Sequence, residues 1–151
     1  MNLEQVLNQK ETEILSQANN ALLRSRLPNY DKDGMAQNEV RLQKLYNLMR
    51  QGIRTKDLTA VVGYAEQLAE ARFAAGFGLH EVQAAFNVLE EAVWQQIIAE
   101  CEPSQLGEAL GLISTVHGAG KDALARKYVS LASHKKAPSL NLQALFEGTD
   151  G

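Results

Sequence analysis

The sequence predicts an all-α protein built from five main helices. Apolar residues recur at helical spacing in five blocks, and glycines and prolines separate the blocks. No segment alternates between apolar and polar residues for long enough to indicate a strand. A chain of 151 residues with 45% hydrophobic and 22% charged residues is typical of one globular domain. Two packings fit this pattern, a globin-like arrangement with steep crossings and an antiparallel four-helix bundle.

The first helix is expected from Leu3 to Arg26. Asn2 is a good N-cap residue, and Gln5 stands three positions later, where a capping box needs it. The helix should end before Pro28, because the residue preceding a proline avoids helical backbone angles. The following segment PNYDKDG, residues 28–34, is rich in turn-forming residues and predicts a turn-rich connection.

The second helix is expected from Met35 to Gln51, with Gly52 as its stop signal. Thr55 then caps the third helix, and Asp57 lies in its first turn, where a negative charge is favourable. Apolar residues continue at helical spacing as far as Phe73.

Two glycines mark the corner between the third and fourth helices. We expect Gly76 to end the third helix in a left-handed conformation and Gly78 to be the N-cap of the fourth, with Glu81 in capping-box position. Arg72 lies on the apolar side of the third helix beside Phe73. If it is buried, this arginine needs a carboxylate or a helix C-terminus as its partner.

The fourth helix, from Leu79 to Cys101, carries a broad apolar stripe and should be central, and the last helix runs from Ser104 to Lys136. Glycine inside a helix costs about 1 kcal/mol relative to alanine, so a row of small residues predicts the close approach of another helix. The row on the last helix provides the interface candidates Gly107, Gly111, Ser114 and Gly118. Residues 1–136 are therefore predicted to form one domain, and residues 137–151 a partly flexible tail with one short helical turn around residues 140–146.

Composition excludes several classes of function. The net charge of −3 offers no basic patch for nucleic acid, and no apolar run approaches the ~20 residues of a membrane span. The N-terminal region lacks the apolar core of a signal peptide. Cys101 is the single cysteine, and its acidic neighbours should raise its pKa, so we interpret it as structural. These features predict a cytoplasmic protein.

His117 is the histidine with the most informative position, because it lies on the apolar stripe of the last helix. It is either a core histidine or the axial ligand of a haem, which globins hold through one proximal histidine. The candidates for a ligand pocket are Arg72, Phe86, Trp94 and His117. No metal site is predicted, because the chain lacks the Glu-x-x-His pattern of helical-bundle metal enzymes, and no catalytic residue is expected.

The segment LAEARFAAGFGLHEVQAAFNVLEEAVW carries a family resemblance through Ala71-Arg72, Gly76, Leu79, Glu81 and Trp94. This pattern resembles the N-terminal domain family of RsbT co-antagonist proteins, the RsbR-type stressosome sensors. The resemblance implies a globin-like sensor domain without haem that forms dimers and controls an output domain, usually a STAS domain. Only a short tail follows the last helix here, so we expect a stand-alone sensor-like protein or an excised domain.

The sequence thus favours a non-enzymatic signalling module that acts through homodimerisation and protein–protein interaction. A STAS-domain protein or a kinase is the candidate partner, and no cofactor is expected. The alternative is a globin-like sensor that binds haem or another tetrapyrrole through His117.

Overall fold

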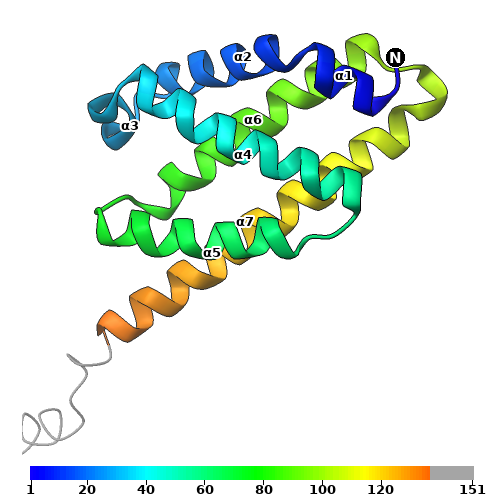
Figure 1. Ribbon diagram of the computed structural model, residues 1–151. Coiled ribbons are helices and arrows are strands. Elements are labelled where there is room, and N and C mark those ends of the chain that lie inside the picture. Colours follow the sequence, from blue (N-terminus) through cyan, green and yellow to red (C-terminus); the bar gives the residue numbers. More distant parts are fainter. Residues whose placement is uncertain (137–151) are drawn as a thin grey trace, which may run out of the picture.

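The computed structural model describes residues 1–136, which form helices and no strand (Figure 1). The elements are α1 (Leu3–Gln9), α2 (Glu11–Arg24), α3 (Pro28–Asp33), α4 (Met35–Thr55), α5 (Thr59–Ala74), α6 (Leu79–Glu100), the 3-10 turn η1 (Pro103–Gln105) and α7 (Leu106–Lys136). The all-α class is confirmed. The predicted tail, including the helical turn at residues 140–146, lies outside the described residues.

Helix α6 occupies the middle of the domain, as its broad apolar stripe predicts. It packs against α2 on one side and against α7 on the other, while α5 lies along α7. In Figure 1, α6 and α7 run obliquely to α2, α4 and α5. The helices of an antiparallel four-helix bundle are nearly parallel to one another, so the oblique crossings argue against that alternative. The globin-like arrangement stays a prediction.

The expected first helix is divided at Lys10 into α1 and α2, so the prediction of one continuous helix is wrong. In an unbroken helix the carbonyl of Leu7 would accept the N–H of Glu11. Here that carbonyl accepts the hydroxyl of the buried Tyr46 from α4. A side chain inserted into the helical hydrogen-bond ladder is a known cause of a kink. The capping box of Asn2 and Gln5 is confirmed.

Residues 28–34 were predicted to be a turn-rich connection, and this is also wrong, because most of the segment is the short helix α3. Pro28 stands at the start of this helix, where its missing N–H and fixed φ angle are favourable. Tertiary contacts support the helix: Tyr30 is 2% exposed, and its carbonyl accepts a 3.1 Å hydrogen bond from the side chain of Asn38. Gly34, with a φ of 85°, ends α3.

Helix α4 passes through Gly52 and ends four residues later than expected, so the predicted stop is wrong. The left-handed residue that follows it is Lys56, with a φ of 57°. Gly52 has a packing role, since a Cβ atom there would stand 3.3 Å from Cγ1 of Val116 on α7. Thr55 is the last residue of α4 and does not cap α5, whose N-cap is Leu58. Asp57 precedes α5 and is not in its first turn, so that prediction is also wrong, although its Oδ1 accepts the N–H of Thr59 at 2.9 Å.

The corner between α5 and α6 is confirmed as predicted. Gly76 has a φ of 86°, its N–H donates to the carbonyl of Phe73, and the N–H of Phe77 donates to the carbonyl of Arg72. These two hydrogen bonds form a Schellman motif. Gly78 then begins α6 as the N-cap, and its N–H donates to Oε1 of Glu81 at 3.1 Å.

Close packing on α7 occurs at a glycine outside the predicted row of small residues. A Cβ atom at Gly120 would stand 2.8 Å from Cε1 of Phe86 and 3.1 Å from Cγ1 of Val61, so α7 approaches α5 and α6 closely at this point. Added Cβ atoms at Gly107 and Gly111 would meet nothing within 4 Å. The row of small residues is therefore unpacked within the described domain.

Candidate functional site

A small cavity lies at the end of the domain where α3, α4, α5 and α6 meet. Its walls include Tyr30, Arg41, Tyr64, Arg72 and Phe86, and its free volume is about 20 Å³. A space of this size holds about one water molecule. Two of the predicted pocket residues, Arg72 and Phe86, therefore line one cavity together.

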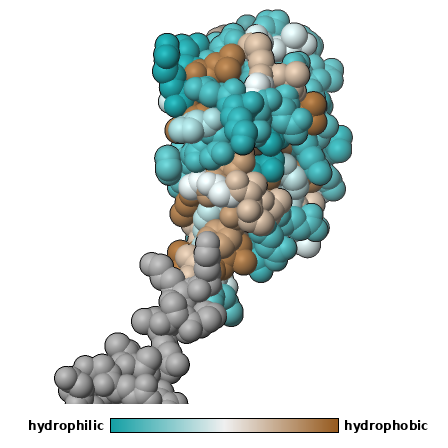
Figure 2. All heavy atoms as spheres, turned by 90° about the vertical axis from the view of Figure 1, so that its left-hand side faces the viewer, coloured by the Kyte–Doolittle hydropathy of each residue, from teal (hydrophilic) through white to brown (hydrophobic). Residues whose placement is uncertain are grey.

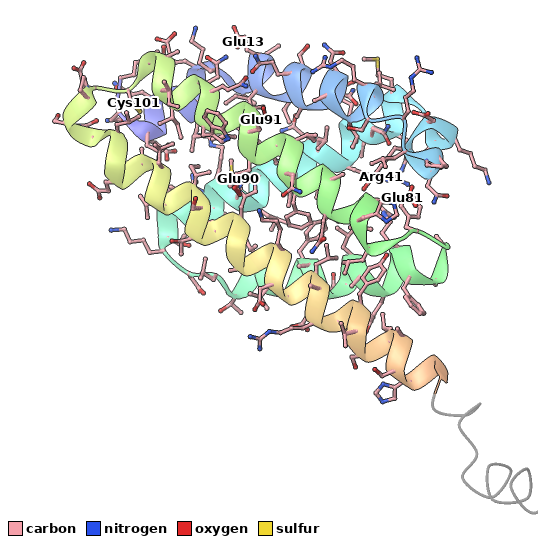
Figure 3. All side chains as sticks on the ribbon, turned by 180° about the vertical axis from the view of Figure 1, so that it is seen from behind. Glu13, Arg41, Glu81, Glu90, Glu91 and Cys101 are labelled. Carbon is pink, nitrogen blue, oxygen red and sulfur yellow. The ribbon has the colours of Figure 1, made fainter. Side chains whose placement is uncertain are left out.

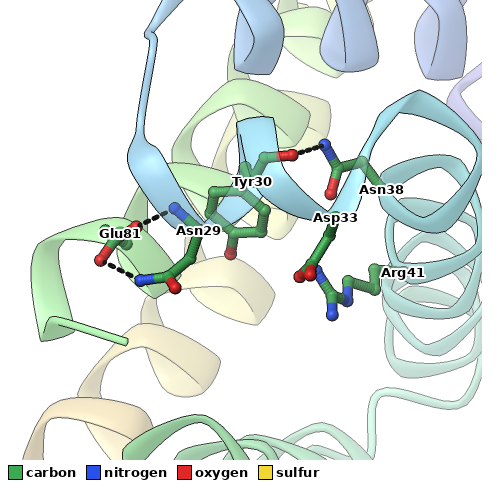
Figure 4. Close-up of polar contacts among 6 residues, drawn as sticks. All are labelled: Asn29, Tyr30, Asp33, Asn38, Arg41 and Glu81. Carbon is green, nitrogen blue, oxygen red and sulfur yellow. Dashed lines mark hydrogen bonds and ion pairs between the residues drawn. The ribbon is translucent and has the colours of Figure 1, made fainter. Parts of the chain in front are cut away.

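Arg41 of α4 is one of two cations at this cavity. Its Nη1 contacts Oδ2 of Asp33 at 2.7 Å, and its guanidinium carbon lies 5.9 Å from the ring centre of Tyr30 (Figure 4). The same carbon lies 5.6 Å from the ring centre of Phe77. Its Nε is buried without a hydrogen-bond partner among the described residues. Arg41 was not among the predicted site residues, because consecutive helical residues point in different directions and the apolar neighbour Leu42 does not indicate where Arg41 lies.

Arg72 of α5 is the second cation, and it makes no ion pair within residues 1–136. Its guanidinium carbon lies 5.3 Å from the ring centre of Phe77, and it stands in the last turn of α5, where the helix dipole favours a positive charge. Burial lowers the pKa of Arg72, and the neighbouring Arg41 lowers it further. Of the two predicted partners, the helix C-terminus is present and the carboxylate is not.

The buried carboxylate nearest this corner, that of Glu81, already has partners. Its oxygens accept the side-chain amide of Asn29 at 2.9 Å and the N–H of Asn29 at 3.2 Å (Figure 4). They also accept the N–H of Gly78. Burial raises the pKa of Glu81, but these hydrogen bonds outweigh burial and hold the pKa below its usual value. Glu81 therefore fastens α3 to the start of α6 and does not neutralise Arg72.

Figure 2 looks onto this end of the molecule. Hydrophilic residues cover most of the upper part of the face, and hydrophobic residues gather lower, where α7 leaves the body of the domain. Val129 of α7 is 62% exposed. The two arginines thus lie at a predominantly polar end of the domain.

His117 lies in a different, fully packed part of the interior. It is 2% exposed, and its surroundings include Leu45, Met49, Val61 and Phe86, with no free volume for even one water molecule. Burial lowers the pKa of His117 to about 4. The imidazole ring lies near the carbonyl of Ile113, which opposes this shift. Neither ring nitrogen makes a hydrogen bond of good geometry. In this arrangement of the helices, the side chains around His117 leave no free space beside its ring.

Trp94 does not join the other predicted pocket residues. It is 38% exposed on α6, and Ile98, one turn later, is 51% exposed. Trp94 and Ile98 follow Glu90 by four and eight residues, so all three lie along one side of α6. Glu90 contacts Lys121 of α7 at 3.4 Å, so this side is the one next to α7. Figure 3 shows α6 and α7 crossing the front of the domain together. We define the α6–α7 surface as Trp94, Ile98, Gly107, Gly111, Ser114 and Gly118.

Metal binding and membrane insertion find no support in the described part of the chain. Residues 1–136 contain no group of three or more histidine, cysteine or acidic side chains that could hold a metal ion. No helix among these residues is long and apolar enough to span a bilayer. The pKa of Cys101 is raised, as predicted, mainly by burial, with Glu102 adding to the shift and the N-terminal amine opposing it.

The comparisons with known proteins identify a family. No curated protein and no solved structure matches the chain. The family model described as the RsbT co-antagonist protein rsbRD N-terminal domain matches residues 15–130, which include most of α2, all of α3 to α6 and most of α7. The match includes both arginines of the cavity and the whole α6–α7 surface. The chain therefore belongs to the family of RsbT co-antagonist rsbRD N-terminal domains.

Proposed function

We propose that this chain is a non-enzymatic signalling domain of the stressosome type, which acts in the cytoplasm as a homodimer through protein–protein contacts. The family match over residues 15–130 is the observation that carries this proposal. A co-antagonist acts by contacting other proteins, so a STAS-domain protein or a kinase is the proposed partner class.

The α6–α7 surface is the proposed dimer interface. It combines two exposed apolar side chains, Trp94 and Ile98, with a row of small residues whose added Cβ atoms would meet nothing within the domain. Small residues let another helix approach closely, and their internal cost of about 1 kcal/mol per glycine is otherwise unexplained. In a two-fold dimer the same patch serves both subunits.

The mass of the protein in solution tests this interface. Size-exclusion chromatography with light scattering should give about twice the chain mass of 16.6 kDa at micromolar concentration. Ile98→Glu places a charge on the α6–α7 surface and should give a monomer, because burying an unpaired carboxylate is costly. Val40→Glu is the matched control: Val40 is 64% exposed on α4, away from this surface, and the variant should remain dimeric.

A wild-type monomer at these concentrations contradicts dimerisation. A dimer that survives Ile98→Glu contradicts the choice of surface, and so does a dimer that dissociates with Val40→Glu. Pull-down with a STAS-domain protein or kinase encoded beside this chain then tests the partner class.

We further propose that the domain signals without haem or another cofactor. The packing around His117 supports this, since a porphyrin has no space there. Addition of haem to the purified protein should give no Soret band that differs between the wild type and His117→Ala. A band that depends on His117 would restore the haem-sensor alternative.

A further inference from the structure

We propose that the cavity between Arg41 and Arg72 is a binding site for a small oxyanion, that is, a carboxylate or phosphate group. The anion would be the ligand that the proposed sensor domain responds to, so this inference rests on the proposed function. Binding of the anion itself is measured independently of dimerisation.

The charges at the cavity are unbalanced. Arg41 is paired with Asp33, whereas Arg72 lacks a carboxylate partner within residues 1–136, and Asp33 is the one acid that acts on Arg72 electrostatically. The carboxylate of Glu81 is held by Asn29 and Gly78. Two guanidinium groups therefore share one carboxylate, and an anion between them would remove the remaining excess of positive charge.

The cavity also has more hydrogen-bond donors than acceptors, and this excess likewise favours an anion. The Nε of Arg41 is buried and unpaired, and Arg72 donates no hydrogen bond within the described chain. Tyr30 and Tyr64 also line the cavity, and their hydroxyls make no hydrogen bond among the described residues. Burial raises the pKa of Tyr30 to about 12, so its hydroxyl keeps its proton and can donate. The walls thus offer several donors and few acceptors.

The size of the cavity limits the ligand. A free volume of about 20 Å³ holds one water molecule or one oxygen atom of an anion. Arg72 is half-buried, so the rest of the anion can lie at the open side of the cavity against its guanidinium group. The planar fork of an arginine matches a carboxylate or phosphate with two parallel hydrogen bonds, which a spherical halide cannot accept in the same way.

A purely structural role for Arg72 accounts for part of its placement. The Phe77 ring and the C-terminus of α5 both favour a cation at this position. Neither contact accepts the in-plane N–H donors of the guanidinium group. The structural role therefore predicts a stable protein whose stability does not respond to particular anions.

Thermal unfolding of the full chain in formate, acetate and inorganic phosphate tests the site, with sodium chloride at the same ionic strength as reference. Binding predicts a saturable rise of the midpoint, by roughly 5–10 °C at one hundred times the Kd. Isothermal titration with the same three anions gives the Kd directly. A midpoint that depends on ionic strength but not on the anion would overturn the proposal.

Arg72→Gln should weaken binding at least tenfold, and Arg72→Lys, which keeps the charge but not the fork, should also weaken it. Arg126→Gln is the matched control, because Arg126 is 80% exposed on α7 and pairs with Asp122 within the same helix; it should bind as the wild type does. Equal binding by Arg72→Gln and the wild type would refute the site. If Arg72→Gln does not fold, the site is tested by the binding of Arg72→Lys and by the comparison of the three anions with chloride on the wild type. A dimer that binds no oxyanion overturns this inference and leaves the proposed function intact.

Discussion

The close approach of α7 to α5 and α6 at Gly120 gives a prediction whose magnitude follows from the structure. Gly120→Ala adds one Cβ atom, which would stand 2.8 Å from Cε1 of Phe86 and 3.1 Å from Cγ1 of Val61. Both neighbours are almost completely buried, at 1% and 2% exposed. Neither side chain can move into solvent, so the helices or the Phe86 ring must shift.

Two opposing effects set the change in the free energy of unfolding. Alanine favours the helix by about 1 kcal/mol over glycine. One extra methyl group in a packed core costs about 1–3 kcal/mol. We therefore expect Gly120→Ala to leave the domain between unchanged and about 2 kcal/mol less stable.

Gly63→Ala is the control that isolates the steric effect. Gly63 lies inside α5, where an added Cβ atom would meet nothing within 4 Å, so this variant should be about 1 kcal/mol more stable than the wild type. The two variants should differ by about 2 kcal/mol, or about 4 to 8 °C in midpoint, in thermal unfolding followed by circular dichroism at one protein concentration. If Gly120→Ala is as stable as Gly63→Ala, the reasoning about close packing is refuted.

Three further predictions concern buried or strained positions. Burial lowers the pKa of His117 from 6.5 to about 4, so as the pH falls the histidine of the unfolded chain is protonated before that of the folded chain. The free energy of unfolding should therefore fall by up to about 3 kcal/mol as the pH drops from about 6.5 to 4. His117→Leu should flatten this dependence in urea unfolding at several pH values, and an unchanged slope would count against it. Tyr46→Phe removes the hydroxyl that the Leu7 carbonyl accepts, and should cost about 1–3 kcal/mol in the same assay, whereas an unaltered urea midpoint would show that this hydrogen bond contributes little. Lys56→Gly should stabilise the domain by about 0.5–1 kcal/mol, because Lys56 is an exposed non-glycine residue with a φ of 57°; a lower melting temperature would contradict this.

Local signals predicted the parts of the fold that neighbouring residues control. The capping box at Asn2 and the turn at Gly76 and Gly78 depend on contacts within five residues, and both form as expected. Predictions failed where a distant residue intervened. Tyr46, 39 positions away, takes the carbonyl of Leu7 and divides the first helix.

In the candidate site, too, local sequence signals identified some residues, and contacts between distant elements determined the others. Arg72 was identified from its place on an apolar helix side, and the structure places it half-buried in the last turn of α5. Its neighbours at the cavity, Tyr30 and Arg41, come from elements that periodicity does not bring together. Trp94 shared the apolar stripe of α6 with Phe86 but lies on the outside, because helical spacing defines a side of the helix and not which neighbour covers it.

The sequence by itself determined the all-α class, the central position of α6, the α5–α6 corner and the family resemblance. These features follow from helical periodicity, capping residues and a local motif, which act over one or two turns. The tertiary structure decided which glycine is packed, which arginine lacks a counter-charge and which helix side is left open. Those outcomes depend on how helices cross, and crossings join side chains that are far apart in the chain.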